Sequence, residues 1–419
     1  MEIKNLEGYK FIIATGCSYG LLPVSVFRTF NLINRTHSFL DINRKLYDEY
    51  GKDWLDIDNN LIVINVSCSG QGSDWQSDSI IHVINKLIKI GVNTSDIYCL
   101  VEWSEWSRFT ISQLYSTKIN KDSFTWSEQN PFEIYDIHKT DILGHYDKLS
   151  SEIFEILKMN LSIPFRNVGR INDRFYLVPS IVNSDDFYRI SKELGDFVKH
   201  VQKINQDYPT EKKIKDYLNN IIKTQFYLKS LGINYNFCFM QSSLSNWFKD
   251  DKKDKISHHL EPPYISNTSS FKDYKKNKNF NPINNINSDI ENVVSEIKNE
   301  IDLLDMSNIW FYENEKFRRG GIDEWTIDNF KEVGYIKLFN NKENILSPID
   351  MICDYGAHPN TVPYLTLWNK ITTNCEYVKV KEDFENFMLN RYWEDYNFDG
   401  FSKNHITLSK KKWIEILNQ

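Results

Sequence analysis

The chain of 419 residues has very little alanine and no long apolar run. Alanine occurs only at Ala14 and Ala357, whereas asparagine, lysine and isoleucine are abundant. This bias is typical of AT-rich coding, so we expect a viral or low-GC bacterial source and do not interpret lysine-rich stretches as functional signals. No run approaches the roughly 18 apolar residues of a membrane span, and the opening residues MEIKNLEGYK lack the pattern of a signal peptide. We therefore expect a cytoplasmic protein without membrane partners.

Paired cysteines and net positive charge are also absent. The six cysteines are dispersed without a C-x-x-C pair, which favours buried free thiols over a disulfide framework or a zinc site. The adjacent histidines at 258–259 lie in a polar stretch, and we predict neither a metal nor an organic cofactor. A formal net charge of -7 gives no overall attraction to nucleic acid.

Apolar segments alternate with helical patterns along much of the chain. Residues 9–15, 61–66, 97–101 and 233–240 read as short buried strands. Apolar residues at helical spacing predict helices over 80–88, 214–228 and 290–304, and Gly91 and Gly232 suit helix ends. Ser73 to Gln76 and Ser288 to Glu291 have the form of capping boxes. This alternation predicts a parallel sheet covered by helices.

Two stretches interrupt the alternation. Residues 109–209 read as a large helical insertion that could cap a site, with helices near 146–159 and 187–204 and a strand near 175–178. Residues 249–287 read as a polar loop. We expect one domain over 1–372 with these insertions, followed by a C-terminal extension over 373–419.

The first predicted strand leads into Gly16-Cys17-Ser18-Tyr19-Gly20. A serine on the turn leaving such a strand lies at the carboxyl edge of the sheet, where open α/β folds place their chemistry. Flanking glycines permit a sharp turn and a close approach by substrate. Ser18 is therefore a candidate nucleophile if a base can reach it. The alternatives are an ordinary turn, or Cys17 as the reactive group.

A second constellation, Asp354-Tyr355-Gly356-Ala357-His358, follows the apolar run 349–353 near the end of the chain. His358 could accept the Ser18 proton, and Asp354 could orient the imidazole. Tyr364, Leu367 and Trp368 indicate a helix behind this loop. The alternative is a surface loop with an ordinary histidine.

Together these segments resemble the SGNH (GDSL-type) hydrolase superfamily. Four blocks stand in that family's order, at residues 16–19, 65–70, 101–104 and 354–358, and the resemblance covers about 1–108, 210–245 and 345–372. It implies a three-layer α/β/α fold with a mainly parallel sheet, here carrying a large helical insertion. It also implies Ser18 as nucleophile, Asp354 and His358 as its partners, and the Ser18 and Gly70 amides as oxyanion donors.

The sequence departs from the family pattern at two points. The third block usually supplies an asparagine to the oxyanion hole, but here Trp103-Ser104 stands in its place, and Ser104 or Arg108 could substitute. Asp354 and His358 are one residue further apart than usual, which leaves Asp323 and Glu324 as reserve carboxylates.

Further residues near the expected carboxyl edge could contact substrate. Ser73 could bind substrate or cap the following helix, and Arg108 could bind substrate or form a structural ion pair. Trp103 could stack on a sugar ring or pack in the core, and the same alternatives hold for Trp75 and Trp106.

The resemblance implies serine-dependent hydrolysis of a carboxylic ester, with an acetyl group on a carbohydrate as the expected substrate. No cofactor and no nucleic-acid partner are expected. The competing hypothesis is a non-catalytic SGNH scaffold that acts in binding or assembly, with a virus particle or further copies of the chain as partners.

Overall fold

The chain forms two compact units in a computed structural model. The first comprises Met1–Leu21, Asn60–Tyr235 and Asp289–Ser307, and the second comprises Leu22–Asn59, Asn236–Ser288 and Asn308–Gln419. Within them the structure describes residues 6–16, 55–58, 60–66, 72–104, 106, 111–114, 142–144, 153, 156–157, 168–171, 174–177, 188, 192–240, 297–312, 321–322, 325 and 361–381.

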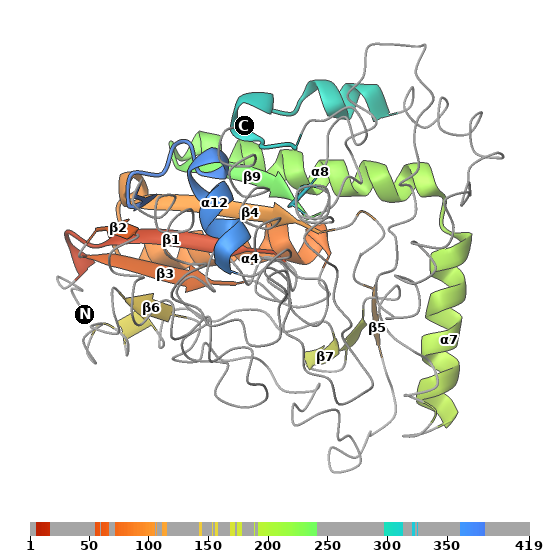
Figure 1. Cartoon of the computed structure of the whole chain (residues 1–419). Coiled ribbons are helices and arrows are strands. Elements are labelled where there is room, and N and C mark those ends of the chain that lie inside the picture. The colour runs from red at the N-terminus through yellow and green to blue at the C-terminus, as the bar shows by residue number, and fades with distance from the viewer. Residues whose placement is uncertain are drawn as a thin grey trace, which may run out of the picture. The chain divides into compact units, whose positions relative to one another are not determined.

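The first unit is built on a sheet whose strand order is β6-β3-β1-β4-β9 (Figure 1). Strands β1 (Lys10–Thr15), β3 (Leu61–Asn65) and β4 (Ile97–Trp103) are parallel, with β1 in the middle. β6 (Ile142–Gly144) pairs antiparallel with β3, and β9 (Asn234–Phe239) passes into the second unit after its second residue. Every residue of β4 is buried, as expected for a strand covered on both faces. The predicted parallel sheet with helices is confirmed.

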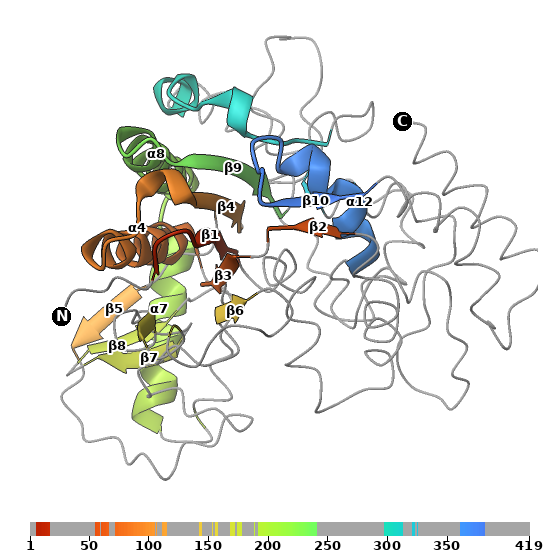
Figure 2. The same cartoon turned by 90° about the vertical axis from the view of Figure 1, so that its left-hand side faces the viewer.

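Helices α4 (Ser73–Lys89) and α8 (Thr210–Ser230) lie side by side along this sheet (Figures 1 and 2). Both end in the same way. Gly91 and Gly232 adopt positive φ angles of 93° and 66°. The next amide after each, at Val92 and Ile233, bonds back to a carbonyl in the last helical turn at 3.0 Å. This is the Schellman motif, and it confirms the helix ends predicted from the two glycines.

The strand order places a reversal between β1 and β4. From β1 the chain moves to β3 on one side and then returns, through α4, to β4 on the other side. In open α/β sheets, ligands bind in the crevice outside the carboxyl ends of the strands at such a switch point. The ends of β1 and β4 are therefore the expected position of a ligand site.

The described residues of the stretch 109–209 include strands as well as helices. Its described residues include β5 (Ile111–Leu114), β7 (Val168–Ile171) and β8 (Arg174–Leu177), which form an antiparallel sheet in the order β5-β8-β7. β6 from the same stretch joins the main sheet. The predicted strand near 175–178 corresponds to β8. The helix expected near 187–204 corresponds to α7 (Lys192–Asp207), and residues 153 and 156–157 are helical as predicted.

The second unit contains α12 (Thr361–Ile371) and an antiparallel pair formed by β2 (Leu55–Ile57) and β10 (Val378–Val380). The Trp368 indole donates to the Val378 carbonyl at 3.1 Å, and the Asn369 side chain bonds both backbone groups of Val380. The helix predicted around Tyr364 is thus confirmed. The first residues of the expected C-terminal extension pack with α12, so they belong to the same unit as that helix.

Candidate functional site

The carboxyl edge of β1, β3 and β4 is the candidate site. Thr15, the last residue of β1, is aligned with Val101 of β4, so β4 continues past the end of β1 through Glu102 and Trp103. Described residues at this edge include Gly16, Ser73 and Ser104. The predicted site residues Ser18, Gly70, Arg108, Asp354 and His358 lie outside the described residues, as do the reserve carboxylates Asp323 and Glu324.

Gln76, in the first turns of α4, fixes the end of β4. Its side-chain amide donates to the Glu102 carbonyl at 2.9 Å, and its oxygen accepts from the Ser104 amide at 3.2 Å. A neighbouring strand would bond the same two backbone groups. Gln76 is fully buried, so both bonds are shielded from water and hold the strand end in one position.

Ser104, predicted as an oxyanion donor, is buried and bonded to Gln76 through two groups. Its hydroxyl lies 3.3 Å from the Gln76 side-chain oxygen that also accepts from its amide. Each of these donors would have to leave Gln76 to bond a developing oxyanion. In this geometry both Ser104 donors hold the end of β4 against Gln76 of α4.

The predicted capping box at Ser73 is wrong. Gly72 is the N-cap of α4 and no side chain bonds there, while Ser73 is the first helical residue. The Ser73 hydroxyl instead accepts from the Asn220 side chain at 3.2 Å. The S-x-x-Q pattern was misleading because Gln76 reaches towards β4 instead of back to the helix start. Ser73 is buried and bonded to Asn220, and its contact with substrate stays a prediction.

The tryptophans at this edge are buried. Trp103 is fully buried, and its ring meets Tyr217 of α8 edge-on, with centroids 6.5 Å apart. Trp75 and Trp106 are also buried. Burial of these rings favours the packing alternative over stacking on a sugar.

A line of polar contacts joins α4 to α8. Besides Ser73–Asn220, the Ser77 and Thr224 hydroxyls lie 2.8 Å apart, and Lys223 forms a 2.8 Å ion pair with Asp78. Further along, Tyr227 donates to Asn85. Residue numbers rise together on both helices, so the helices run parallel.

Because Asn220 aligns with the first residue of α4, residues 210–219 of α8 project past that point by about 15 Å. This projecting part carries Tyr217, whose ring packs on Trp103. The first half of α8 therefore forms a wall beside the carboxyl edge of the sheet.

A carboxylate at this edge was missed by the sequence analysis. Glu102 is fully buried within β4. Because Trp103 packs on α8 and successive strand residues point to opposite faces, the Glu102 side chain lies on the face of β4 away from α8. An acidic residue inside an otherwise apolar strand, IYCLVEW, was the signal that could have identified it.

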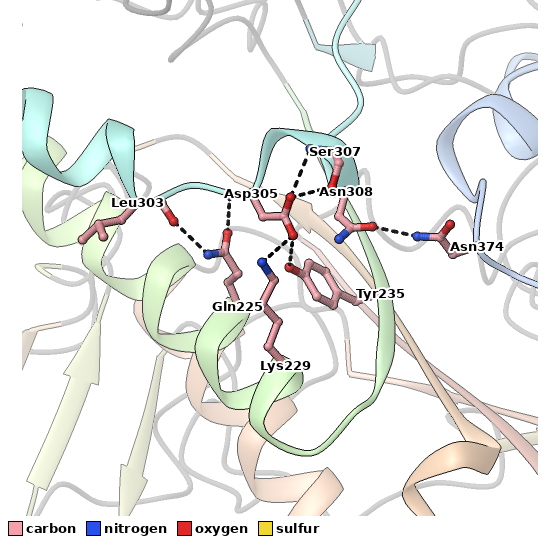
Figure 3. Close-up of polar contacts among 8 residues, drawn as sticks. All are labelled: Gln225, Lys229, Tyr235, Leu303, Asp305, Ser307, Asn308 and Asn374. Carbon is pink, nitrogen blue, oxygen red and sulfur yellow. Dashed lines mark hydrogen bonds and ion pairs between the residues drawn. The ribbon is translucent and has the colours of Figure 1, made fainter.

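A second buried glutamine has the same role at another place in this unit (Figure 3). Gln225 of α8 donates to the Leu303 carbonyl at 2.9 Å and accepts from the Asp305 amide at 2.7 Å. The Asp305 carboxylate accepts from Ser307 and Tyr235 and pairs with Lys229. These contacts join the end of α8 to residues 303–307. The polar groups around Asp305 therefore have a structural role.

The remaining chemistry of the described residues is limited. Cys99, Cys238 and Cys375 are buried free thiols, and burial raises the pKa of Cys99 and of Cys375. Within the described ranges, no three His, Cys, Asp or Glu side chains are grouped so that they could hold a metal ion. None of the helices described there has both the length and the apolar composition of a membrane span.

Comparison with known proteins identifies no relative of this chain. The chain matches no family model, no curated protein and no solved structure.

Proposed function

We propose that the protein is a serine-dependent carboxylic ester hydrolase of the SGNH type, with a three-layer α/β/α domain. The strand arrangement carries the proposal. β3, β1 and β4 are adjacent and parallel, and each is followed within five residues by one family-like segment, which contains Gly70, Ser18 or Ser104 respectively. Three separate segments of the sequence are thereby attached to neighbouring ends of one sheet edge.

In the proposed reaction, the Ser18 hydroxyl attacks the ester carbonyl while His358 takes its proton. The alcohol then leaves with that proton, and an acyl-enzyme remains. Water, deprotonated by His358, attacks the acyl group and releases the acid and free Ser18. Asp354 orients the imidazole. Backbone amides of Ser18 and Gly70 stabilise the developing oxyanion, and one such donor contributes about 3–4 kcal/mol. An acetyl group on a carbohydrate is the proposed substrate, with Ser73 and Arg108 as the proposed binding residues.

The alternative is a non-catalytic SGNH scaffold that binds or assembles, with a virion or further copies of the chain as partners. One observation favours it: both described donors of Ser104 already bond Gln76, and no asparagine stands at that position. The oxyanion hole would then lack its third donor.

Labelling of the full chain with a fluorophosphonate probe distinguishes the two proposals. We expect modification at Ser18, located by peptide mass spectrometry, and loss of modification in Ser18→Ala. Cys17→Ala is the matched control, because it changes the adjacent side chain and should be labelled like the wild type. Labelling that survives in Ser18→Ala, or a folded wild type that does not react, would reject the hydrolase.

Substrate class is tested with p-nitrophenyl esters of increasing acyl length and with acetylated oligosaccharides. We expect the acetyl ester to be turned over faster than butyryl and octanoyl esters, and acetate to be released from the oligosaccharide. Preference for the long acyl chains would reject the carbohydrate acetyl substrate while leaving the hydrolase proposal intact.

A further inference from the structure

Thr15, the last residue of β1, carries a buried hydroxyl. The residue is 1% exposed, and its side-chain oxygen has no hydrogen-bond partner among the described residues. Leaving such a group unsatisfied lowers stability, and a valine of the same shape would avoid that cost. Few buried polar groups in native proteins lack a partner, and a bound molecule or ion is one of the explanations when they do. The Thr15 hydroxyl is therefore available to a ligand.

The Thr15 side chain lies on the face of β1 that the helices cover. Thr15 is aligned with Val101 of β4, and aligned residues of neighbouring strands share a face of the sheet. Trp103, two residues further along β4, shares that face and packs against Tyr217 of α8. Because α4 packs against both β1 and β4, the Thr15 hydroxyl points into the layer between the sheet and α4.

The first turn of α4 lies at the same end of the sheet. Gln76 bonds backbone groups of β4 that lie one and three residues beyond the position aligned with Thr15. α4 has 17 residues and begins after Gly72, where no side chain of the described ranges caps the helix. The start of a helix presents free amides and about half a positive charge, which favour an anion. The hydroxyl and the uncapped helix start therefore face the same place.

Lys213 adds a positive charge beyond the start of α4. Asn220 and Thr224 of α8 bond to α4, and Lys213 precedes them by about two and three helical turns, so it emerges on the same side of α8. Because Asn220 bonds Ser73, the first residue of α4, Lys213 faces the region in front of that helix. It is partly exposed, and burial lowers its pKa. A partly desolvated ammonium attracts an anion more strongly than one in open water.

The described carboxylates nearest to this place point elsewhere. Asp74, in the first turn of α4, precedes Asp78 by four residues and so shares its side of the helix. Asp78 pairs with Lys223 on the exposed surface. Glu102 lies on the opposite face of β4. Among the described residues, the charge in front of α4 is therefore positive.

We propose that the start of α4 is an anion-binding subsite, which takes the carboxylate or phosphate group of a small ligand. The first-turn amides of α4 and the Thr15 hydroxyl donate hydrogen bonds to the anion, and Lys213 supplies the balancing charge. This inference goes beyond the proposed function, because none of these groups has a chemical role in ester hydrolysis. In a hydrolase the subsite would select an acidic substrate, and in a scaffold it would bind the same anion without turnover.

Isothermal titration calorimetry on the full chain tests the subsite with inorganic phosphate and with glucuronate, and glucose is the uncharged control. We expect at least one of the two anions to bind, and the comparison shows whether phosphate or carboxylate is preferred. Affinity should fall by about tenfold or more in Thr15→Val, which loses a hydrogen bond to a charged group, and by about fivefold or more in Lys213→Gln. Without the anion, Thr15→Val should be at least as stable in urea as the wild type, because an unsatisfied hydroxyl is removed.

Two matched variants serve as controls. Lys212→Gln removes the adjacent lysine, which pairs with Asp216, and should keep the affinity. Ser79→Ala removes another buried hydroxyl that lacks a partner in the described part of the chain, one turn further into α4, and should also keep it. A wild type that binds neither anion, or equal affinity in the wild type, Thr15→Val and Lys213→Gln, would overturn the inference. Should Thr15→Val not fold, Lys213→Gln against Lys212→Gln decides.

The two proposals fail in different ways. Anion binding by a chain that is not labelled at Ser18 supports the subsite and rejects the hydrolase. Labelling at Ser18 without anion binding rejects the subsite and leaves the hydrolase intact.

Discussion

Two buried glutamines each bridge two backbone groups of a segment far away in the sequence. Gln76 and Gln225 each bond the carbonyl of one residue and the amide two residues later. The groups that Gln76 reaches, on the buried residues Glu102 and Ser104, would otherwise be buried without a partner. Such side chains contribute to stability by the penalty that they prevent, which exceeds the net gain of an ordinary hydrogen bond.

The variant Gln76→Leu should expose this penalty. Two backbone groups at the end of β4 lose their partner, and each buried unsatisfied group costs about 1–3 kcal/mol. We expect the free energy of unfolding, measured in urea, to fall by about 2–4 kcal/mol. Gln225→Leu is the matched control. It removes the same two kinds of bond from the less buried residues 303 and 305, so it should destabilise less and leave the reactivity of Ser18 unchanged. A Gln76→Leu variant as stable as the wild type would contradict this account.

Burial of the Cys99 thiol predicts a loss of stability at alkaline pH. Burial raises its pKa in the folded chain, whereas an exposed thiol titrates near about 8.5. Below a pH of about 8.5 the thiol is neutral in both the folded and the unfolded chain, so its ionisation does not change the free energy of unfolding. Above it the unfolded thiol ionises first, so stability falls by up to about 1.4 kcal/mol per pH unit.

This pH effect is measured by urea unfolding of the wild type and of Cys99→Val between pH 7 and pH 10. The difference between the two should stay constant up to about pH 8.5 and then change in favour of the variant. Parallel curves throughout that range would show that Cys99 does not contribute the expected linkage.

At the scale of the element, the ends of α4 and α8 depend on glycine. Gly91 and Gly232 adopt positive φ angles, and no atom lies within 4 Å of the position that a Cβ would occupy. Any cost of substitution there comes from the backbone conformation itself. At both positions the glycine ends a helix and turns the chain towards the next strand of the sheet, which is β4 after Gly91 and β9 after Gly232.

We expect Gly91→Ala and Gly232→Ala each to lower the free energy of unfolding by about 1–2 kcal/mol. Asparagine tolerates the left-handed region better, so Gly91→Asn should cost less than Gly91→Ala. Equilibrium unfolding in urea measures both differences. An alanine variant that is no less stable than the asparagine variant would argue against the left-handed conformation.

At the scale of the whole molecule, the sequence predicted the longer buried elements well. Strands β1, β3, β4 and β9 and helices α4, α8 and α12 were predicted because apolar runs and helical periodicity extend over enough residues to be distinctive. β2 and β10 were not predicted. Each has three residues, too few for a period, and they pair across most of the chain length.

The candidate site was less predictable than the fold. Gln76 was assigned to a helix cap because local patterns cannot show a contact with Ser104, which lies 28 residues away. Glu102 was passed over because one acidic residue in a strand has no periodic signal. Both depend on tertiary contacts, and only the strand order brings them to the same edge.

The polar contacts between α4 and α8 have a consequence for how the first unit folds. They join residues that are 142 to 147 positions apart in the chain, so they cannot form until a long loop has closed. Contacts of such high sequence separation slow folding. Docking of α8 onto α4 should therefore be a late event. The first half of α8 should take its place beside the carboxyl edge of the sheet only when folding is nearly complete.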